Sequence, residues 1–262
     1  MSGTAATFVL VHGAWQGNWV WERVAFGLRA AGQTVFTPSL TGIGERAHLS
    51  GPSIDLDTHI ADVLGIIEHH ELDRIVLVGH SYAGMVIGGV ADRIPRRIIS
   101  LVFLDAFIPV AGKSILDFLP PEHAAALRAG AEKEGQGWRV KPIPAAVFRV
   151  ARPDDAARID RQAVDHPLAA MEQKSAVTGV WATVPHLVYI RASGQPPEPF
   201  AQFADQVRTD PKWQYFELPC GHNAMLDLPE ALIGVLLGCA ARTADVSSPE
   251  GPEGKFTSIK PE

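Results

Sequence analysis

The sequence predicts an α/β protein with a mostly parallel, doubly wound sheet into which a helical cap is inserted. Between residues 7 and 104, short β-branched apolar runs alternate with longer segments of helical spacing, which is typical of βα units. These runs are continuously apolar rather than alternating, as expected for strands covered on both faces. After Pro109 no clear strand is expected until His186, which indicates an insertion.

Each predicted element has a local signal for its start or its end. The first strand runs into a glycine turn, the second is stopped by Pro38, and the first helix ends at Gly32. The second helix is opened by Asp55 or Asp57 as its cap. The predicted strands are Thr7–Val11, Thr34–Thr37, Arg74–Val78, Ile98–Leu104, His186–Arg191 and Trp213–Leu218; the predicted helices are Trp19–Ala31, Leu56–His70, Ala83–Ile94, Pro121–Ala129, Asp154–Ala163 and Pro229–Ala241.

These elements define the expected organisation of the chain. Residues 1–109 and 184–245 form the core, and residues 110–183, rich in Ala, Pro and Arg, form the helical cap. Residues 246–262 are rich in Ser, Pro, Gly, Glu and Lys, so we expect a disordered tail there.

Composition narrows the classes of function. The net charge of −6 and the absence of a basic run give no sign of a surface that binds nucleic acid. No apolar stretch is long enough to span a bilayer, and the N-terminus lacks a charged leader, so a cytoplasmic protein without a membrane segment is expected. With two cysteines and neither CxxC nor HExxH, no disulfide framework and no metal site are predicted. The oligomeric state stays open.

The strongest local signal is Gly79-His80-Ser81-Tyr82-Ala83-Gly84, placed between a predicted strand and a predicted helix. A tight strand–turn–helix exposes a serine hydroxyl at a helix N-terminus, where developing negative charge is favoured. Ala83 stands where the G-x-S-x-G pattern has its last glycine. We interpret Ser81 as a nucleophile, the alternative being a chance match in an ordinary turn.

A serine hydroxyl needs a base to take its proton. His222 follows Gly221 just past the last predicted strand, the only one of ten histidines in that position. The turn His12-Gly13-Ala14 follows the first strand, so we expect the backbone amides of Ala14 and Tyr82 to converge as an oxyanion hole.

The acid that orients His222 has two candidates. Glu198 is the one carboxylate in the loop after the penultimate strand, but beside prolines it fits a solvated helix start. Asp105 ends an apolar strand, where an unpaired carboxylate is costly to bury. We therefore favour Asp105 paired with His222, with a turn cap as its alternative role.

The array HGAW, GHSYAG and GH, over about residues 8–236, resembles the α/β-hydrolase superfamily, especially the branch of plant methylesterases and hydroxynitrile lyases. The stretch Thr41–Leu49 and the LDAF at Leu104–Phe107 look more like bacterial carbendazim (carbamate) hydrolases. This resemblance implies an α/β-hydrolase fold, small ester, carbamate or amide substrates, and no cofactor. The chain departs from the family pattern in the loop after the penultimate strand, where Pro196 stands in place of the Asp that acts as the acid in those relatives.

The resemblance implies an acyl-enzyme on Ser81 and a pocket under the cap. The aromatic side chains expected to form apolar walls for the substrate are Trp15, Phe107, Trp138 and Trp181, with Phe148 as a weaker candidate; packing in the core is the alternative for each. Two other functions stay open: a non-hydrolytic enzyme such as a lyase or a cofactor-free perhydrolase, and a catalytically silent binding protein.

Overall fold

A six-stranded sheet lies at the centre of the computed structural model, which describes residues 6–194 and 199–241. The strand order is β2-β1-β3-β4-β7-β8, and each neighbouring pair is parallel. The strands are β1 (Thr7–Val11), β2 (Thr34–Phe36), β3 (Ile75–His80), β4 (Ile98–Leu104), β7 (His186–Ala192) and β8 (Trp213–Leu218).

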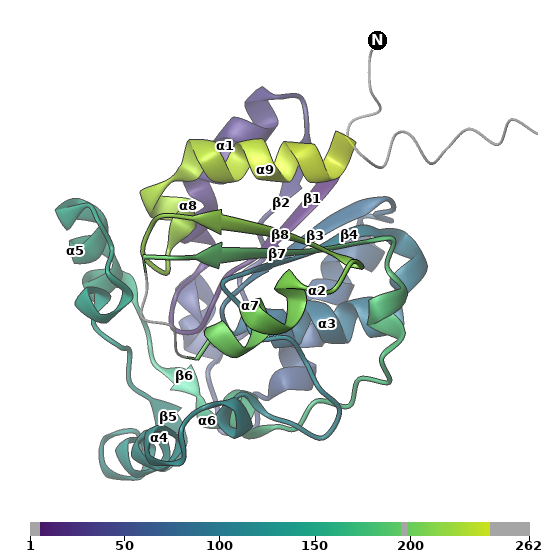
Figure 1. The fold of residues 1–262 in the computed structure, drawn as a ribbon. Helices are drawn as coiled ribbons and strands as arrows, with labels where there is room; N and C mark the ends of the chain where they lie inside the picture. The colour runs from purple at the N-terminus through teal and green to yellow at the C-terminus, as the bar shows by residue number, and fades with distance from the viewer. Residues whose placement is uncertain (1–5, 195–198, 242–262) are drawn as a thin grey trace, which may run out of the picture.

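Helices cover both faces of this sheet (Figure 1). On one face lie α1 (Glu22–Ala30) and α9 (Pro229–Ala241), which share a hydrophobic cluster with the strands. On the other face lie α2 (Leu56–His69), α3 (Ala83–Arg93) and α7 (Ala201–Arg208), which contribute to a second cluster. The predicted α/β fold with a doubly wound parallel sheet is therefore confirmed.

Local differences from the predicted elements have physical causes. The first helical segment begins as a 3₁₀ turn (Asn18–Trp21) before α1. Asp55, rather than Asp57, caps α2, because its side chain accepts the Thr58 amide proton at 2.8 Å in a capping box. Arg74 lies outside β3 because its backbone is left-handed, with φ of 50°. Helix α7 was not predicted.

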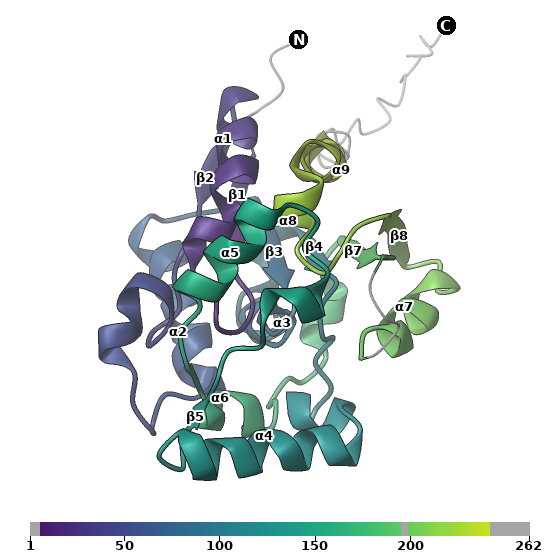
Figure 2. The same cartoon turned by 90° about the vertical axis from the view of Figure 1, so that its left-hand side faces the viewer.

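Between β4 and β7 the chain forms a mainly helical layer that lies beyond the ends of the strands (Figure 2). It contains α4 (Pro121–Glu134), α5 (Pro153–Gln162) and α6 (Leu168–Glu172), with short 3₁₀ turns at Ile115–Phe118, Ala145–Phe148 and Val180–Thr183. The expectation of no strand here is wrong: β5 (Arg139–Val140) pairs antiparallel with β6 (His166–Pro167). Two-residue strands are too short to produce a periodic pattern.

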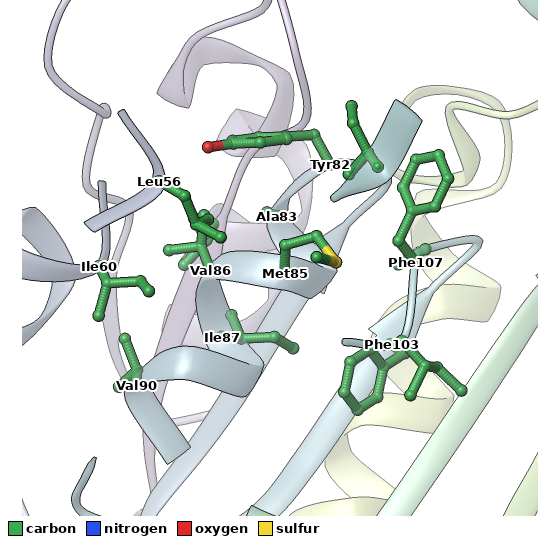
Figure 3. Close-up of a cluster of buried hydrophobic side chains, with 14 of the residues drawn as sticks. Leu56, Ile60, Tyr82, Ala83, Met85, Val86, Ile87, Val90, Phe103 and Phe107 are labelled. Carbon is green, nitrogen blue, oxygen red and sulfur yellow. The ribbon is translucent and has the colours of Figure 1, made fainter. Parts of the chain in front are cut away.

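Helix α3 is buried along almost its whole length, from Ala83 to Ala91. Leu56 and Ile60 of α2 lie on one side of it, and Phe103 and Phe107 of the β4 segment lie on the other (Figure 3). A helix enclosed in this way fixes the position of the turn at its N-terminus. That turn holds Ser81.

The remaining elements are short 3₁₀ turns at Gly44–Leu49 and Pro95–Arg97, and α8 (Ala224–Asp227). In the described part of the chain, no helix has both the length and the apolar character that crossing a membrane requires. The predicted tail, residues 246–262, lies outside the described residues.

Candidate active site

The carboxyl ends of the parallel strands bring together residues that are far apart in the chain. Ser81 follows β3, Asp105 follows β4, and His222 lies shortly after β8. Ala14 comes after β1, which is paired with β3. Because parallel strands end at one edge of the sheet, these four segments meet there.

Ser81 occupies a strained turn. Its φ is 56°, in the left-handed region, which costs a non-glycine residue about 1–2 kcal/mol. Three backbone hydrogen bonds hold the turn: the Ser81 amide donates to Leu104, and the Ser81 carbonyl accepts from Gly84 (3.1 Å) and Phe107 (3.2 Å). Strain held in place by its surroundings is a feature of functional sites.

The packing around this turn explains why the motif ends in Ala83-Gly84. Ala83 is buried without a clash, whereas a Cβ on Gly84 would lie 2.0 Å from the carbonyl oxygen of Phe107. The close approach of the β4 loop to α3 therefore requires glycine at position 84. The turn after β1 is equally close, since a Cβ on Gly13 would lie 3.0 Å from the Cβ of Ser81.

His222 is fixed on both its ring and its backbone. Its Nδ1 donates a proton to Oδ2 of Asp105 at 2.7 Å. Its backbone amide donates to the carbonyl of Phe148 (3.0 Å), and its carbonyl accepts from Nε2 of His80 (2.9 Å). The rings of Phe148 and Phe200 stack on the imidazole, with centroids 5.4 and 5.0 Å away. With Nδ1 engaged, Nε2 is the nitrogen left to act as a base.

Asp105 is completely buried and held by the end of β7. Its amide donates to the carbonyl of Ile190 at 2.7 Å. Its second carboxylate oxygen, Oδ1, accepts hydrogen bonds from the guanidinium of Arg191 and from the amide of Ala192. The structure thus places Asp105 against His222, while Glu198 lies outside the described residues.

A buried histidine sets the direction of the Ala14 amide. The Leu40 amide donates to Nε2 of His12 (3.1 Å), so the ring proton is on Nδ1 and is donated to the Gly13 carbonyl (2.8 Å). In a planar trans peptide the Ala14 N–H points opposite to that carbonyl. Among the described residues, neither the Ala14 nor the Tyr82 amide is engaged in a backbone hydrogen bond. Both amides are therefore available as donors beside Ser81.

Tyr82, next to Ser81, is anchored by a second buried histidine. The Tyr82 hydroxyl donates to Nδ1 of His59 at 2.8 Å, since Nε2 of His59 donates to the carbonyl of Thr41. Burial raises the pKa of the Tyr82 hydroxyl well above 10. His166 of β6 packs edge-on against Tyr82, with ring centroids 4.8 Å apart.

Burial favours the neutral form of these histidines. It lowers the pKa of His12 and of His59 from 6.5 to about 4, and it lowers the pKa of His80 and His166 well below 6.5. Between pH 6.5 and about 4 the unfolded chain therefore binds more protons than the folded chain. The contribution of these histidines to folding stability is therefore fully present above pH 6.5 and is lost as the pH falls through this window.

We expect His59→Gln to flatten this pH dependence. Glutamine can accept from Tyr82 and donate to Thr41 but does not titrate. The unfolding free energy is measured in urea at pH 7.5 and at pH 5. The stability advantage of wild type over the variant should be about 2 kcal/mol smaller at pH 5 than at pH 7.5. His69→Gln, at an exposed position, is the control. An identical pH dependence in wild type and His59→Gln would contradict the assignment.

A cavity of about 500 Å³ opens beside Ser81, Tyr82, Ala14 and His222. Among the described residues, the remaining walls are almost entirely apolar, and His123 of α4 is the one titratable side chain that they contribute. Among the apolar residues are Trp15, Phe107, Ile115, Leu127, Phe148, Met171 and Phe200. Trp15, Phe107 and Phe148 thus lie where a substrate would contact them.

The other two predicted walls lie elsewhere. Trp181 is buried against Phe103 and Trp213, with ring centroids 5.9 and 6.2 Å away, in the hydrophobic cluster to which α2, α3 and α7 contribute. The guanidinium of Arg139 stacks on the ring of Trp138, 4.3 Å from its centroid. Neither tryptophan is among the cavity residues in the described ranges. Both tryptophans instead pack against neighbouring side chains. The prediction failed because the sequence of a helical insertion gives no signal for the direction in which an aromatic side chain points.

Trp15 joins the cavity wall to the layer above it. Its indole nitrogen donates to the carbonyl of Val140 in β5 (3.1 Å), and its carbonyl accepts from the amide of Val164 (2.9 Å). Its φ of 63° is left-handed, so these contacts hold a strained residue in place.

Sequence reasoning missed Arg191 and Phe200. Arg191 carried a usable signal, because it ends an apolar strand just as Asp105 does, and a buried guanidinium also needs a partner. Phe200 carried none, since its position beside His222 depends on how α7 packs.

Comparison with known proteins adds independent evidence. Residues 8–235 match the model of the alpha/beta hydrolase family. The chain is 47% identical to a carbendazim hydrolyzing esterase of Nocardioides sp. (strain SG-4G) over 234 residues, 87% of this chain and 96% of that protein. It is 35% identical to salicylic acid-binding protein 2 of Nicotiana tabacum over 103 residues, 39% of this chain and 40% of that one.

A solved structure supports the same family assignment. An extracellular alpha/beta-hydrolase from a Paenibacillus species, described as sharing structural and functional homology with the tobacco protein, superposes with a TM-score of 0.79 at 25% identity, covering 89% of this chain and 98% of that one. The predicted resemblance to carbendazim hydrolases and to the methylesterase branch is confirmed. With its parallel sheet, its strained serine turn and a family match over most of its length, this chain belongs to the alpha/beta hydrolase family.

Proposed function

We propose that this protein hydrolyses small, mainly apolar esters or carbamates through an acyl-enzyme on Ser81. One observation carries the proposal: Ser81, His222, Ala14 and Tyr82 line the same apolar cavity, with Asp105 hydrogen-bonded to His222 behind it and the Ala14 and Tyr82 amides unused. The likeness to a carbendazim hydrolyzing esterase supports carbamates as one substrate class.

The proposed reaction has two steps. Ser81 attacks the substrate carbonyl while Nε2 of His222 takes its proton, and Asp105 stabilises the imidazolium that forms. The amides of Ala14 and Tyr82 bind the tetrahedral oxyanion, each contributing about 3 kcal/mol. His222 then protonates the leaving group and activates the water that releases the acyl group.

The cavity supports a neutral substrate with a flat apolar part. Apart from the reacting groups, the walls formed by described residues offer one titratable side chain, His123, so a charged substrate would lose hydration there with little compensation. Phe148 and Phe200 stack on His222, and Phe107 packs against Phe200, so the cavity offers aromatic surface for such a part. A cytoplasmic location and a reaction without a cofactor stay predictions.

Covalent labelling tests the proposal. A fluorophosphonate should form one adduct per chain, located at Ser81 by peptide mass spectrometry, with parallel loss of hydrolysis of p-nitrophenyl acetate and of an aryl carbamate. Denatured protein is the control, because an unactivated serine hydroxyl is a poor nucleophile. An adduct at another residue would assign the nucleophile to that residue. Substrate binding without labelling or turnover would favour a binding protein instead.

A further inference from the structure

Arg191 is a charged residue inside the protein. It lies near the end of β7 in the run HLVYIRA, and its side chain is 7% exposed. Its guanidinium pairs with Oδ1 of Asp105, which is 0% exposed. A buried cation next to a buried anion is retained only where its geometry is well satisfied.

The two oxygens of Asp105 have different partners. Oδ2 accepts the Nδ1 proton of His222 at 2.7 Å, while Oδ1 accepts from Arg191 and from the Ala192 amide. The end of β7 thus binds one side of the carboxylate and leaves the other side for the imidazole. Asp105 reaches this position from β4, in a left-handed conformation with φ of 40°.

Charge balance gives this arrangement a consequence for His222. Without a cation, a fully buried Asp105 would be an uncompensated anion, and such groups take up a proton instead. A protonated Asp105 could donate to Nδ1 of His222, which would put the imidazole proton on Nε2. In that tautomer His222 has no lone pair with which to accept the Ser81 proton.

We propose that Arg191 is a positioning residue for the hydrolytic reaction, which keeps Asp105 ionised and thereby fixes the tautomer of His222. This inference rests on the proposed function. Arg191 acts through Asp105 and does not line the cavity.

Among the described residues, three other titratable side chains near the pair keep one protonation state around neutral pH. Burial raises the pKa of the Cys220 thiol to about 12 and that of the Tyr189 hydroxyl well above 10, and it lowers the pKa of His80 well below 6.5. Glu217, opposite Arg191 in the β7–β8 register, accepts from Arg208 and Tyr215. Wild type and the Arg191 variants share every other titratable group, including His123 of the cavity, so a difference between their pH profiles reports on the triad.

The test is the pH dependence of kcat and KM for p-nitrophenyl acetate in Arg191→Met and Arg191→Lys. We expect Arg191→Met to lower kcat about 100-fold at pH 7, less than the ~10⁴-fold cost of a fully inverted tautomer, with KM changed little. The loss should shrink as the pH rises, because a protonated Asp105 ionises again. Arg191→Lys keeps the charge and should retain most of the activity.

A matched control is available in Arg23, which makes a bidentate pair with the buried Asp155 at 2.7 Å for both contacts. This pair touches no triad residue. Arg23→Met should lower stability, by less than Arg191→Met because the Arg23 side chain is 37% exposed, and leave the shape of the pH profile unchanged. A purely structural role of Arg191 would give the same result as this control.

A comparison of two further variants covers the case in which Arg191→Met does not fold. Asp105→Asn with Arg191→Met buries no charge and should have the same kcat as Asp105→Asn alone. A further loss in the double variant, or a kcat and pH profile of wild type in Arg191→Met, would overturn the inference. An inactive wild type, or Ser81→Ala as active as wild type, would instead overturn the proposed function.

Discussion

Ser81→Ala is expected to lower kcat for p-nitrophenyl acetate by about 10⁶-fold, the cost of removing a serine nucleophile that works with a base. The change removes the one atom that forms the acyl-enzyme and leaves the cavity, the two amides and His222 in place. The measurement is steady-state kinetics with subtraction of the background hydrolysis.

A stability measurement separates this loss from misfolding. Alanine at φ of 56° has the same backbone strain as serine, so the melting temperature of Ser81→Ala should match that of wild type. Ser81→Gly should be equally inactive but more stable by about 1 kcal/mol, because glycine tolerates this conformation. Equal rates for wild type and Ser81→Ala would remove Ser81 from the mechanism.

Asp105→Asn is expected to lower kcat by about 10⁴-fold with little change in KM. The asparagine amide can donate to Nδ1 of His222 and so favours the tautomer that cannot act as a base. The variant also removes the carboxylate charge that pairs with Arg191 inside the protein, so its unfolding free energy should fall.

Glu198→Gln is the matched control for the acid. It removes the other candidate carboxylate and should stay within a few-fold of wild-type activity, because Asp105 already accepts the Nδ1 proton of His222. A large loss in Glu198→Gln together with a small one in Asp105→Asn would transfer the role of the acid to Glu198.

The sequence by itself determined what depends on neighbours along the chain. Continuous apolar runs predicted the strands, because burial on both faces leaves no room for alternation. The serine motif could be recognised because strand, turn and helix follow one another within a few residues. Asp105 was found because an unpaired carboxylate at the end of an apolar strand is costly, which is a local argument about an otherwise distant contact.

The tertiary structure decided what depends on segments far apart in the chain. Arg191 meets Asp105 across 86 positions, and His222 meets it across 117. Trp181 was expected in the cavity wall and lies in the core, while Phe200, for which nothing was expected, lines the cavity. The packing of the 3₁₀ turns and of α7, not the residue type, sets which ring reaches the cavity. A side chain's direction in an insertion is fixed only when that insertion packs on the sheet, so sequence periodicity carries no record of it.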